Sequence, residues 1–228
     1  AGTPGLIGPG PHLICLDTTT VFTVVVDDGS PTPPDTVAIT ILVTDPPFAG
    51  NDTLVCEKYF EPVDASVPTN SFSMAKTITC LLVEQAIERG EISSWDEPVR
   101  KFLPWVGAVR DVEGYRNVEL EKNAKALTLR HLVTMTAGLA WNESYVSPLG
   151  ITAKAYYGSD IEATMRKVPV VAKPGEVFEY QSGATQLLGL VLEQVTGKHL
   201  AELASERIWK PMGAEAPATW SLAKENGR

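Results

Sequence analysis

Two residues three positions apart, Ser73 and Lys76, carry the clearest chemical signal of the sequence. They open a stretch in which apolar residues recur near the helical period, and a helix would bring both side chains onto one face. A serine hydroxyl is a weak nucleophile and needs a neighbouring base, which a lysine amine can provide. The pair therefore predicts acyl transfer through a serine ester.

The same spacing occurs a second time, at Ser221 and Lys224, because so short a pattern also arises by chance. The second copy lies in a polar tail with no apolar face that could bury the lysine, and we interpret it as the chance match. Ser73 instead follows Asn70 and Ser71, which can cap the start of a helix, where the helix dipole disfavours a positive charge. The alternative for the first copy is a capped amphipathic helix whose lysine reaches into solvent.

A second candidate group, Tyr180 and Ser182, precedes an apolar run that predicts a helix over 184–196, with Gly197 as its stop. A tyrosine at the start of a helix, beside a serine and lysine pair, could relay the proton that passes from the nucleophile to the leaving group. The alternative is a tyrosine whose ring packs on the protein while its hydroxyl lies in water.

Four blocks of the sequence resemble, in order, motifs of the class C β-lactamase and penicillin-binding-protein family of serine hydrolases. They are NSFSMAKT at 70–77, LRHLVTMTAGL at 129–139, PG at 174–175 with YQS at 180–182, and IWKPMG at 208–213. The resemblance spans roughly residues 54–228. It implies that Ser73 is the acylated nucleophile, Lys76 its base or proton partner, and Tyr180 a proton shuttle. It also implies that the backbone N–H of Ser73 forms half of an oxyanion hole.

Two positions depart from the family pattern. Where the family has Tyr-x-Asn, this chain has Ser182, which keeps a hydrogen-bonding group but lacks the amide that holds a substrate carbonyl. We expect Ser182 to bind substrate, and the change favours an esterase or an amidase resembling aminohexanoate-oligomer hydrolases. The family's third motif, Lys-Thr-Gly or His-x-Gly on a C-terminal strand, is not found. The resemblance therefore implies a domain that lacks its C-terminal part, and an inactive fragment is one alternative.

Two regions of the chain differ in their patterns. Residues 1–52 contain two strand-like runs, 21–26 and 37–43, and resemble the end of an immunoglobulin-like or cadherin-like β-sandwich. Residues 53–228 would form a partial β-lactamase-like hydrolase domain of the α/β (α+β) class. The resemblance implies an antiparallel sheet flanked by helices, incomplete at its C-terminus, with a helical subdomain that carries Tyr180.

Local patterns suggest further elements in the second region. A strand is expected at 54–60, helices are expected at 73–89, 128–135, 159–168, 184–196 and 198–209, and the polar, aperiodic stretch 107–125 reads as a surface excursion.

Composition limits the partners of the protein. Its 228 residues hold 19 Lys and Arg against 28 Asp and Glu, a net charge of -9, which disfavours nucleic acid and anionic membrane surfaces as partners. No apolar run is long enough for a membrane span. The cysteines and histidines are scattered, so neither a metal site nor a disulfide scaffold is indicated, and His131 is interpreted as structural. They are Cys15, Cys56, Cys80, His12, His131 and His199.

These observations together predict a serine hydrolase that works without a metal or cofactor. The resemblance implies that the substrate is a small ester or amide: a β-lactam, a D-amino-acid peptide, a short ester or an aminohexanoate-type oligomer. The rival function is a non-catalytic binding or adhesion module derived from a hydrolase. A periplasmic or secreted protein is favoured by the family resemblance and by the similarity of the first region to immunoglobulin-like or cadherin-like repeats of bacterial surface proteins.

Overall fold

The structure is a computed structural model, and it describes residues 20–24, 39–43, 70–145, 147, 150–214 and 216–220. The chain divides into two compact units, Ala1–Thr69 and Asn70–Arg228. The strand predicted at 54–60 and the second serine and lysine pair, Ser221 and Lys224, lie outside the described residues.

The first unit contains a two-stranded antiparallel sheet. Strand β1 (Thr20–Val24) pairs with β2 (Ile39–Val43), and Phe22 stands opposite Ile41. Both strands are rich in β-branched residues, which suit a pleated surface, and both overlap the strand-like runs of the sequence.

The described residues of the second unit form helices joined by loops. A 3₁₀ turn, η1 (Phe72–Met74), runs into α1 (Ala75–Glu88). It is followed by α2 (Val99–Phe102), α3 (Asn117–Ala126), α4 (Leu129–Val133), α5 (Ile151–Tyr157), α6 (Ile161–Met165), α7 (Ser182–Thr196) and α8 (Leu200–Ala204), and a π-helical turn, η2 (Ser205–Trp209), ends the series.

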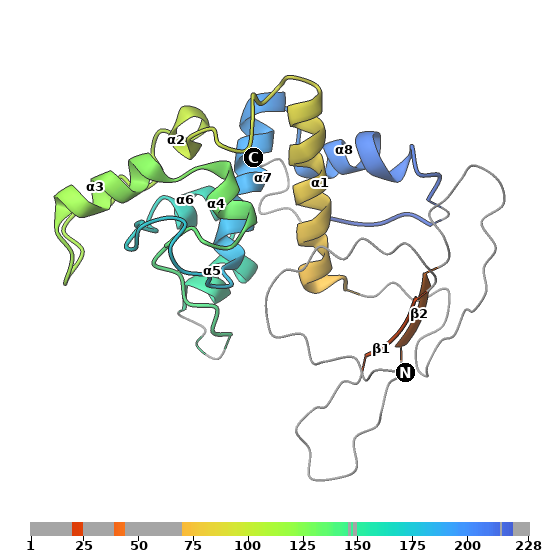
Figure 1. Ribbon diagram of the computed structural model, residues 1–228, viewed down its shortest axis with the longest axis horizontal. Helices are drawn as coiled ribbons and strands as arrows, with labels where there is room; N and C mark the ends of the chain where they lie inside the picture. Colours follow the sequence, from red (N-terminus) through yellow and green to blue (C-terminus); the bar gives the residue numbers. More distant parts are fainter. Residues whose placement is uncertain are drawn as a thin grey trace, which may run out of the picture. The chain divides into compact units, whose positions relative to one another are not determined.

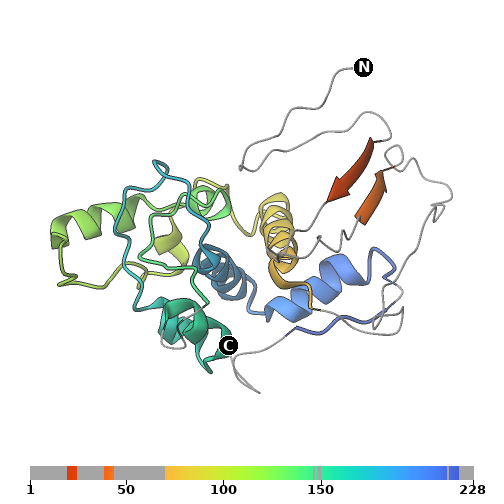
Figure 2. The same ribbon diagram turned by 90° about the horizontal axis from the view of Figure 1, so that it is seen from below.

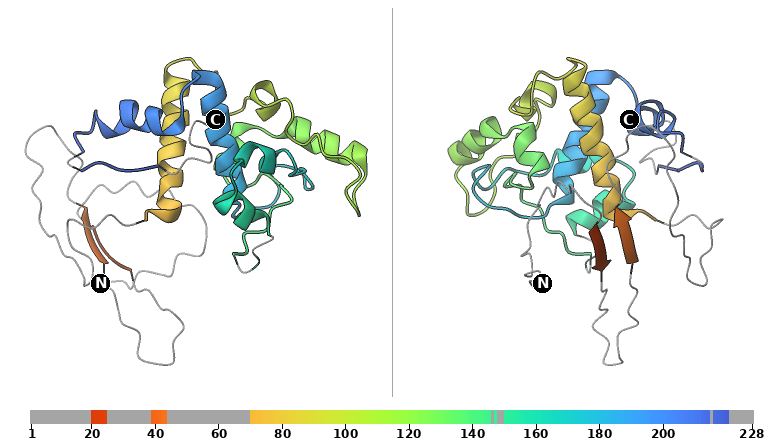
Figure 3. Two further views of the ribbon diagram at one scale, coloured as in Figure 1. Left: turned by 180° about the vertical axis from the view of Figure 1, so that it is seen from behind. Right: turned by 45° about the vertical axis from the view of Figure 1, so that its right-hand side comes forward.

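Helices α1 and α7 lie side by side at the centre of this unit (Figure 1 and Figure 3). Leu82, Val83 and Ala86 of α1 are fully buried, and so are Leu188 and Val191 of α7. These residues recur three or four positions apart, so each helix turns one apolar stripe towards the other. Helices α4 and α6 pack on α7, α8 packs on α1, and α3 and α8 lie on opposite sides of the central pair (Figure 2).

The predicted antiparallel sheet of the hydrolase domain is wrong for the described residues. Between residues 70 and 220 these contain no strand, and extended pairing is limited to two isolated bridges, Pro98 with Thr128 and Leu139 with Val170. The reason is visible in the pattern: apolar residues there recur at helical spacing, whereas a half-buried strand needs alternation. The sheet was expected from the resemblance and had no alternating run behind it in this stretch.

The surface excursion predicted over 107–125 is also corrected. Its second half forms most of α3, which buries Leu120 and Ala124 on one face. Two buried residues four positions apart in a polar run are enough for one helical stripe, but too few to stand out as periodicity. The expected stop of α7 is confirmed, because Gly197 adopts a left-handed φ of 70° directly after the helix.

Candidate active site

Ser73 and Lys76 lie at the start of α1. Ser73 is an exposed residue in the 3₁₀ turn η1, and Lys76 stands in the first turn of the α-helix that follows. The Lys76 Nζ donates a hydrogen bond to the Ser73 Oγ over 3.2 Å. Residues three apart share a helix face, so local geometry alone accounts for this contact.

Tyr180 reaches the same oxygen from 107 positions further along the chain. Its hydroxyl donates a hydrogen bond to the Ser73 Oγ over 2.7 Å. The Lys76 Nζ lies 5.1 Å from the centre of the Tyr180 ring, within the range of a cation–π contact. The structure thus brings Ser73, Lys76 and Tyr180 together, with two donors converging on one serine oxygen.

The backbone around this group includes two residues with left-handed conformations. Phe72, directly before Ser73, has φ of 43°, and Met135 has φ of 55°. The Met135 carbonyl accepts a hydrogen bond from the N–H of Glu179, the residue before Tyr180, over 2.8 Å. Residues other than glycine rarely adopt positive φ, and such positions are concentrated at functional sites.

Ser182 takes part in a different group. Its side chain is 7% exposed, and its Oγ donates a hydrogen bond to one oxygen of Glu143. Its backbone N–H donates to the other Glu143 oxygen over 2.8 Å. The structure therefore pairs Ser182 with a carboxylate, and the substrate-binding role predicted for Ser182 stays a prediction.

Glu143 accepts two further hydrogen bonds, from the indole Nε1 of Trp141 over 2.7 Å and from the hydroxyl of Tyr145 over 2.8 Å. Burial raises the pKa of Glu143, but hydrogen bonds from Ser182, Tyr145 and Trp141 outweigh burial and leave that pKa below its ordinary value. The hydrogen bond to Glu143 in turn raises the pKa of Tyr145 to about 12.

The sequence did not reveal Glu143, because its partner Ser182 lies 39 positions away. One signal was present: two aromatic donors flank Glu143 at two positions on either side, and alternate residues of an extended segment point the same way. That signal indicates that hydrogen bonds hold the Glu143 carboxylate in place, but it does not indicate that Ser182 is the partner.

Gln181 provides a second anchor beside Tyr180. It is 1% exposed, and its Nε2 donates to the Leu139 carbonyl over 2.9 Å. The Leu139 N–H donates back to the Gln181 Oε1 over 3.3 Å, and the Gln181 Nε2 also donates to Glu179. A buried amide whose oxygen and nitrogen both have partners holds its backbone in one place.

His131 has a local role in the described structure. Its Nδ1 accepts a hydrogen bond from the Thr128 N–H over 3.2 Å, at the start of α4. A Cβ at Gly175 would lie 3.1 Å from the His131 Nε2, so the turn before Tyr180 passes close to this ring. Burial lowers the pKa of His131, which favours the neutral imidazole that can accept this bond.

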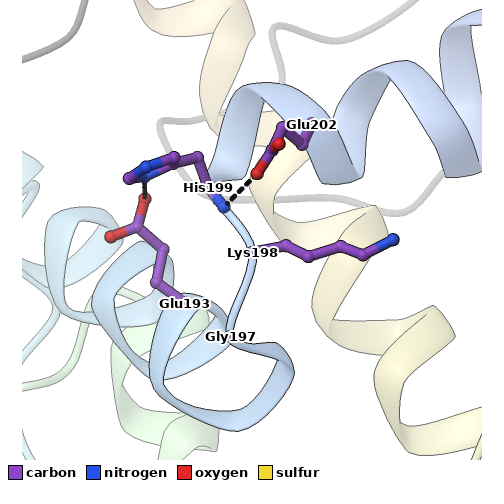
Figure 4. Close-up of a pocket in the computed structure, with 5 residues that line it drawn as sticks. All are labelled: Glu193, Gly197, Lys198, His199 and Glu202. Carbon is purple, nitrogen blue, oxygen red and sulfur yellow. Dashed lines mark hydrogen bonds and ion pairs between the residues drawn. The ribbon is translucent and has the colours of Figure 1, made fainter. Parts of the chain in front are cut away.

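A separate hollow lies at the turn between α7 and α8 (Figure 4). It is lined by Glu193, Gly197, Lys198, His199 and Glu202. The His199 N–H donates to Glu202 over 2.9 Å, and the His199 Nδ1 lies 3.6 Å from the Glu193 carboxylate, while Lys198 points away from that pair. The polar contacts in this hollow are those of the start of helix α8, and none of the predicted site residues line the hollow.

Two further properties concern the described residues as a whole. Nowhere in that part of the chain do three or more His, Cys, Asp or Glu residues gather in a way that could hold a metal ion. Within the same residues, no helix combines the length and the apolar character that crossing a membrane requires.

Comparison with known proteins shows a family and several relatives. Residues 48–228 match the model of the Beta-lactamase family. The chain is 28% identical over 161 residues to monacolin J acid methylbutanoyltransferase of Aspergillus terreus, covering 67% of this chain and 38% of the relative. It is 29% identical over 150 residues to esterase EstB of Burkholderia gladioli, covering 62% of this chain and 36% of the esterase. The chain thus spans less than half the length of these relatives.

Solved structures show likeness of fold. A candidate beta-lactamase from Bacteroides dorei DSM 17855 superposes with a TM-score of 0.55 and 24% identity, over 76% of this chain and 48% of that one. A candidate 6-aminohexanoate-dimer hydrolase from Bacillus anthracis superposes with a TM-score of 0.52 and 24% identity, over 85% of this chain and 44% of that one. At this identity the likeness concerns the fold alone.

Proposed function

Because the chain belongs to the beta-lactamase family, whose model it matches over residues 48–228, we propose that it is a serine hydrolase acting through an acyl-enzyme on Ser73. One observation carries the proposal: the Ser73 Oγ lies 3.2 Å from the Lys76 Nζ and 2.7 Å from the Tyr180 hydroxyl. Both distances suit proton transfer between positioned groups.

In the proposed acylation, the Ser73 Oγ attacks the substrate carbonyl carbon while its proton passes to the amine of Lys76. A bond forms between the Ser73 Oγ and the carbonyl carbon, and the electron pair of the carbonyl π bond moves to the carbonyl oxygen. This oxygen becomes an oxyanion, which the Ser73 N–H helps to stabilise. When the oxyanion collapses, the bond to the leaving group breaks and Tyr180 protonates the departing oxygen or nitrogen. Lys76 returns its proton to Tyr180, and a water molecule repeats the sequence to release the acid.

The proposed substrate is a small ester or amide, with a short ester as the first choice. EstB is named as an esterase, and the Aspergillus terreus relative is named as a methylbutanoyltransferase, so both names describe chemistry of an acyl group. The serine at position 182, where the family pattern has asparagine, supports an ester or amide over a β-lactam.

Two finer proposals rest on the sequence. Residues 1–52 would form a β-rich module distinct from the hydrolase region 53–228. The protein would act in the periplasm or outside the cell, because its strand-rich first region resembles repeats of bacterial surface proteins.

Turnover of p-nitrophenyl acetate and of nitrocefin tests the proposal. We expect hydrolysis of the ester by the wild-type protein, loss of that activity in Ser73→Ala, and no loss in Ser221→Ala, which alters the second copy of the motif. Hydrolysis by Ser73→Ala at the wild-type rate would refute it. A non-catalytic binding module would give no turnover above background with either substrate.

A further inference from the structure

Tyr180 is not part of the buried core. Its side chain is 40% exposed, and residues 175–179 before it are all exposed. A tyrosine in such a run can rotate or shift with its backbone unless a neighbour holds it. The buried neighbours are the next two residues, Gln181 and Ser182.

Glu143 caps the helix that begins at Ser182. Helix α7 has Gln181 at its N-cap, and that residue makes no side-chain cap hydrogen bond. The Ser182 N–H, one of the amides left without a helical partner, instead donates to the Glu143 carboxylate over 2.8 Å. A negative charge at this place also interacts favourably with the helix dipole, so Glu143 fixes the start of α7 from another segment.

Glu143 is itself held in one orientation. The Trp141 indole and the Tyr145 hydroxyl each donate to one of its two oxygens, and the Trp141 ring is buried. A Cβ at Gly183 would lie 2.5 Å from the Trp141 ring, so this glycine lets the ring pack directly against the first turn of α7. The Glu143 carboxylate and the Trp141 ring therefore both contact the first turn of α7.

We propose that Glu143 is a positioning residue for Tyr180. It acts through Ser182: by fixing the first turn of α7 it holds the residue two positions earlier, so that the Tyr180 hydroxyl stays within 2.7 Å of the Ser73 Oγ. The inference rests on the proposed function, because it assigns a role within the same site. The proposed role also explains the serine two positions after Tyr180. The Ser182 hydroxyl and the Ser182 backbone N–H each donate to a different oxygen of the Glu143 carboxylate.

Glu143→Gln tests this role, because it keeps the shape of the side chain and removes the charge and one acceptor oxygen. The readouts are the rate constant for labelling of Ser73 by a small fluorophosphonate, and kcat and KM for p-nitrophenyl acetate. We expect the labelling rate constant and kcat to fall roughly 10- to 100-fold, as for a reacting group displaced by about 1 Å, while KM changes little. Glu143→Asp, which restores the charge, should recover part of the loss.

A matched control separates positioning from general destabilisation. Asp160 accepts a hydrogen bond from the Ala163 N–H over 2.9 Å and caps α6, so Asp160→Ala weakens a helix start elsewhere in the same unit. We expect this variant to label at the wild-type rate. Equal losses in Asp160→Ala and Glu143→Gln at similar thermal stability would overturn the inference, and so would an unchanged rate in Glu143→Gln.

Amide hydrogen exchange provides a readout that does not depend on activity. In Glu143→Gln the Ser182 amide should exchange roughly fivefold faster, as expected for loss of a helix cap. Exchange at the wild-type rate would overturn the inference even if the protein had no activity. A wild-type protein that fluorophosphonate leaves unlabelled would instead argue against the proposed function, so the two failures can be told apart.

Discussion

At the scale of single residues, the Ser73 oxygen is the point where two donors from different parts of the chain meet. Lys76 reaches this oxygen because it lies one helical turn after Ser73, and Tyr180 reaches it because helices α1 and α7 pack together. The first contact is secured by local geometry, whereas the second depends on the position of the segment that precedes α7. The two donors should therefore respond differently to changes elsewhere in the protein.

Replacing Tyr180 by phenylalanine tests the relay directly. Tyr180→Phe removes the hydroxyl and keeps the ring beside Lys76, so folding should be unchanged while kcat for p-nitrophenyl acetate falls about 10²- to 10⁴-fold. Tyr157→Phe is the matched control, because the Tyr157 side chain is 87% exposed and should leave kcat unchanged. Wild-type kcat in Tyr180→Phe would show that the hydroxyl plays no part in the reaction.

How far the site could be predicted differs from residue to residue. The contact between Ser73 and Lys76 follows from spacing on a helix, so the sequence was sufficient. The approach of Tyr180 spans 107 positions and no spacing rule reaches that far, so it was expected only through the resemblance. Glu143 had neither support, because its contact with Ser182 is a tertiary one and glutamate is common on protein surfaces.

At the scale of elements, the pairing of α1 with α7 determines whether the site exists. Both helices were expected from their periodicity, and the stop of α7 at Gly197 was expected from its residue type. The missed elements are short or polar, such as α3, whose two buried residues do not make a visible period. The sheet was expected from the resemblance, and helical spacing in residues 70–220 explains why the described part lacks one.

The buried face of α7 should dominate stability. Leu188 is fully buried, so Leu188→Ala should lower the free energy of unfolding by about 2–5 kcal/mol, because it removes apolar contacts and leaves a cavity. Leu81→Ala on α1 is the control, since Leu81 is about half exposed and should cost far less. Urea denaturation measures both, and equal losses would contradict the packing described for these helices.

The contact between α2 and α3 should make stability depend on pH. Hydrogen bonds and attraction from Arg100 and Lys125 lower the pKa of Glu121 from its ordinary 4.5 to about 2. A lowered folded pKa means that this carboxylate stabilises the fold above pH 4.5 and that the contribution disappears as the pH falls towards 2. The carboxylate is partly exposed, so solvent screening reduces the effect.

The free energy of unfolding, measured at pH 7 and pH 3, checks this dependence. Glu121→Gln should lose less stability between the two values than the wild-type protein does. Glu113→Gln, which changes an exposed carboxylate nearby, should behave like the wild type. The ion pairs of Glu121 would be irrelevant to stability if the two variants showed the same pH dependence.

At the scale of the whole molecule, family membership and local geometry support the same chemistry from independent directions. The family model matches residues 48–228. Of the three residues that the motifs single out, Lys76 and Tyr180 both lie within hydrogen-bonding distance of the Ser73 Oγ. The net charge of -9 makes a polyanionic partner unfavourable, which is consistent with a small uncharged ester as substrate.

The central claim is that Ser73 is the nucleophile, and it is tested most directly by peptide mapping with mass spectrometry after treatment with a fluorophosphonate, which phosphonylates an activated serine. The account predicts a single adduct on the peptide that contains Ser73, its disappearance in Ser73→Ala, and its persistence in Ser221→Ala. An adduct that forms equally at Ser221, or a protein that remains unmodified under conditions that label a control serine hydrolase, would contradict the account.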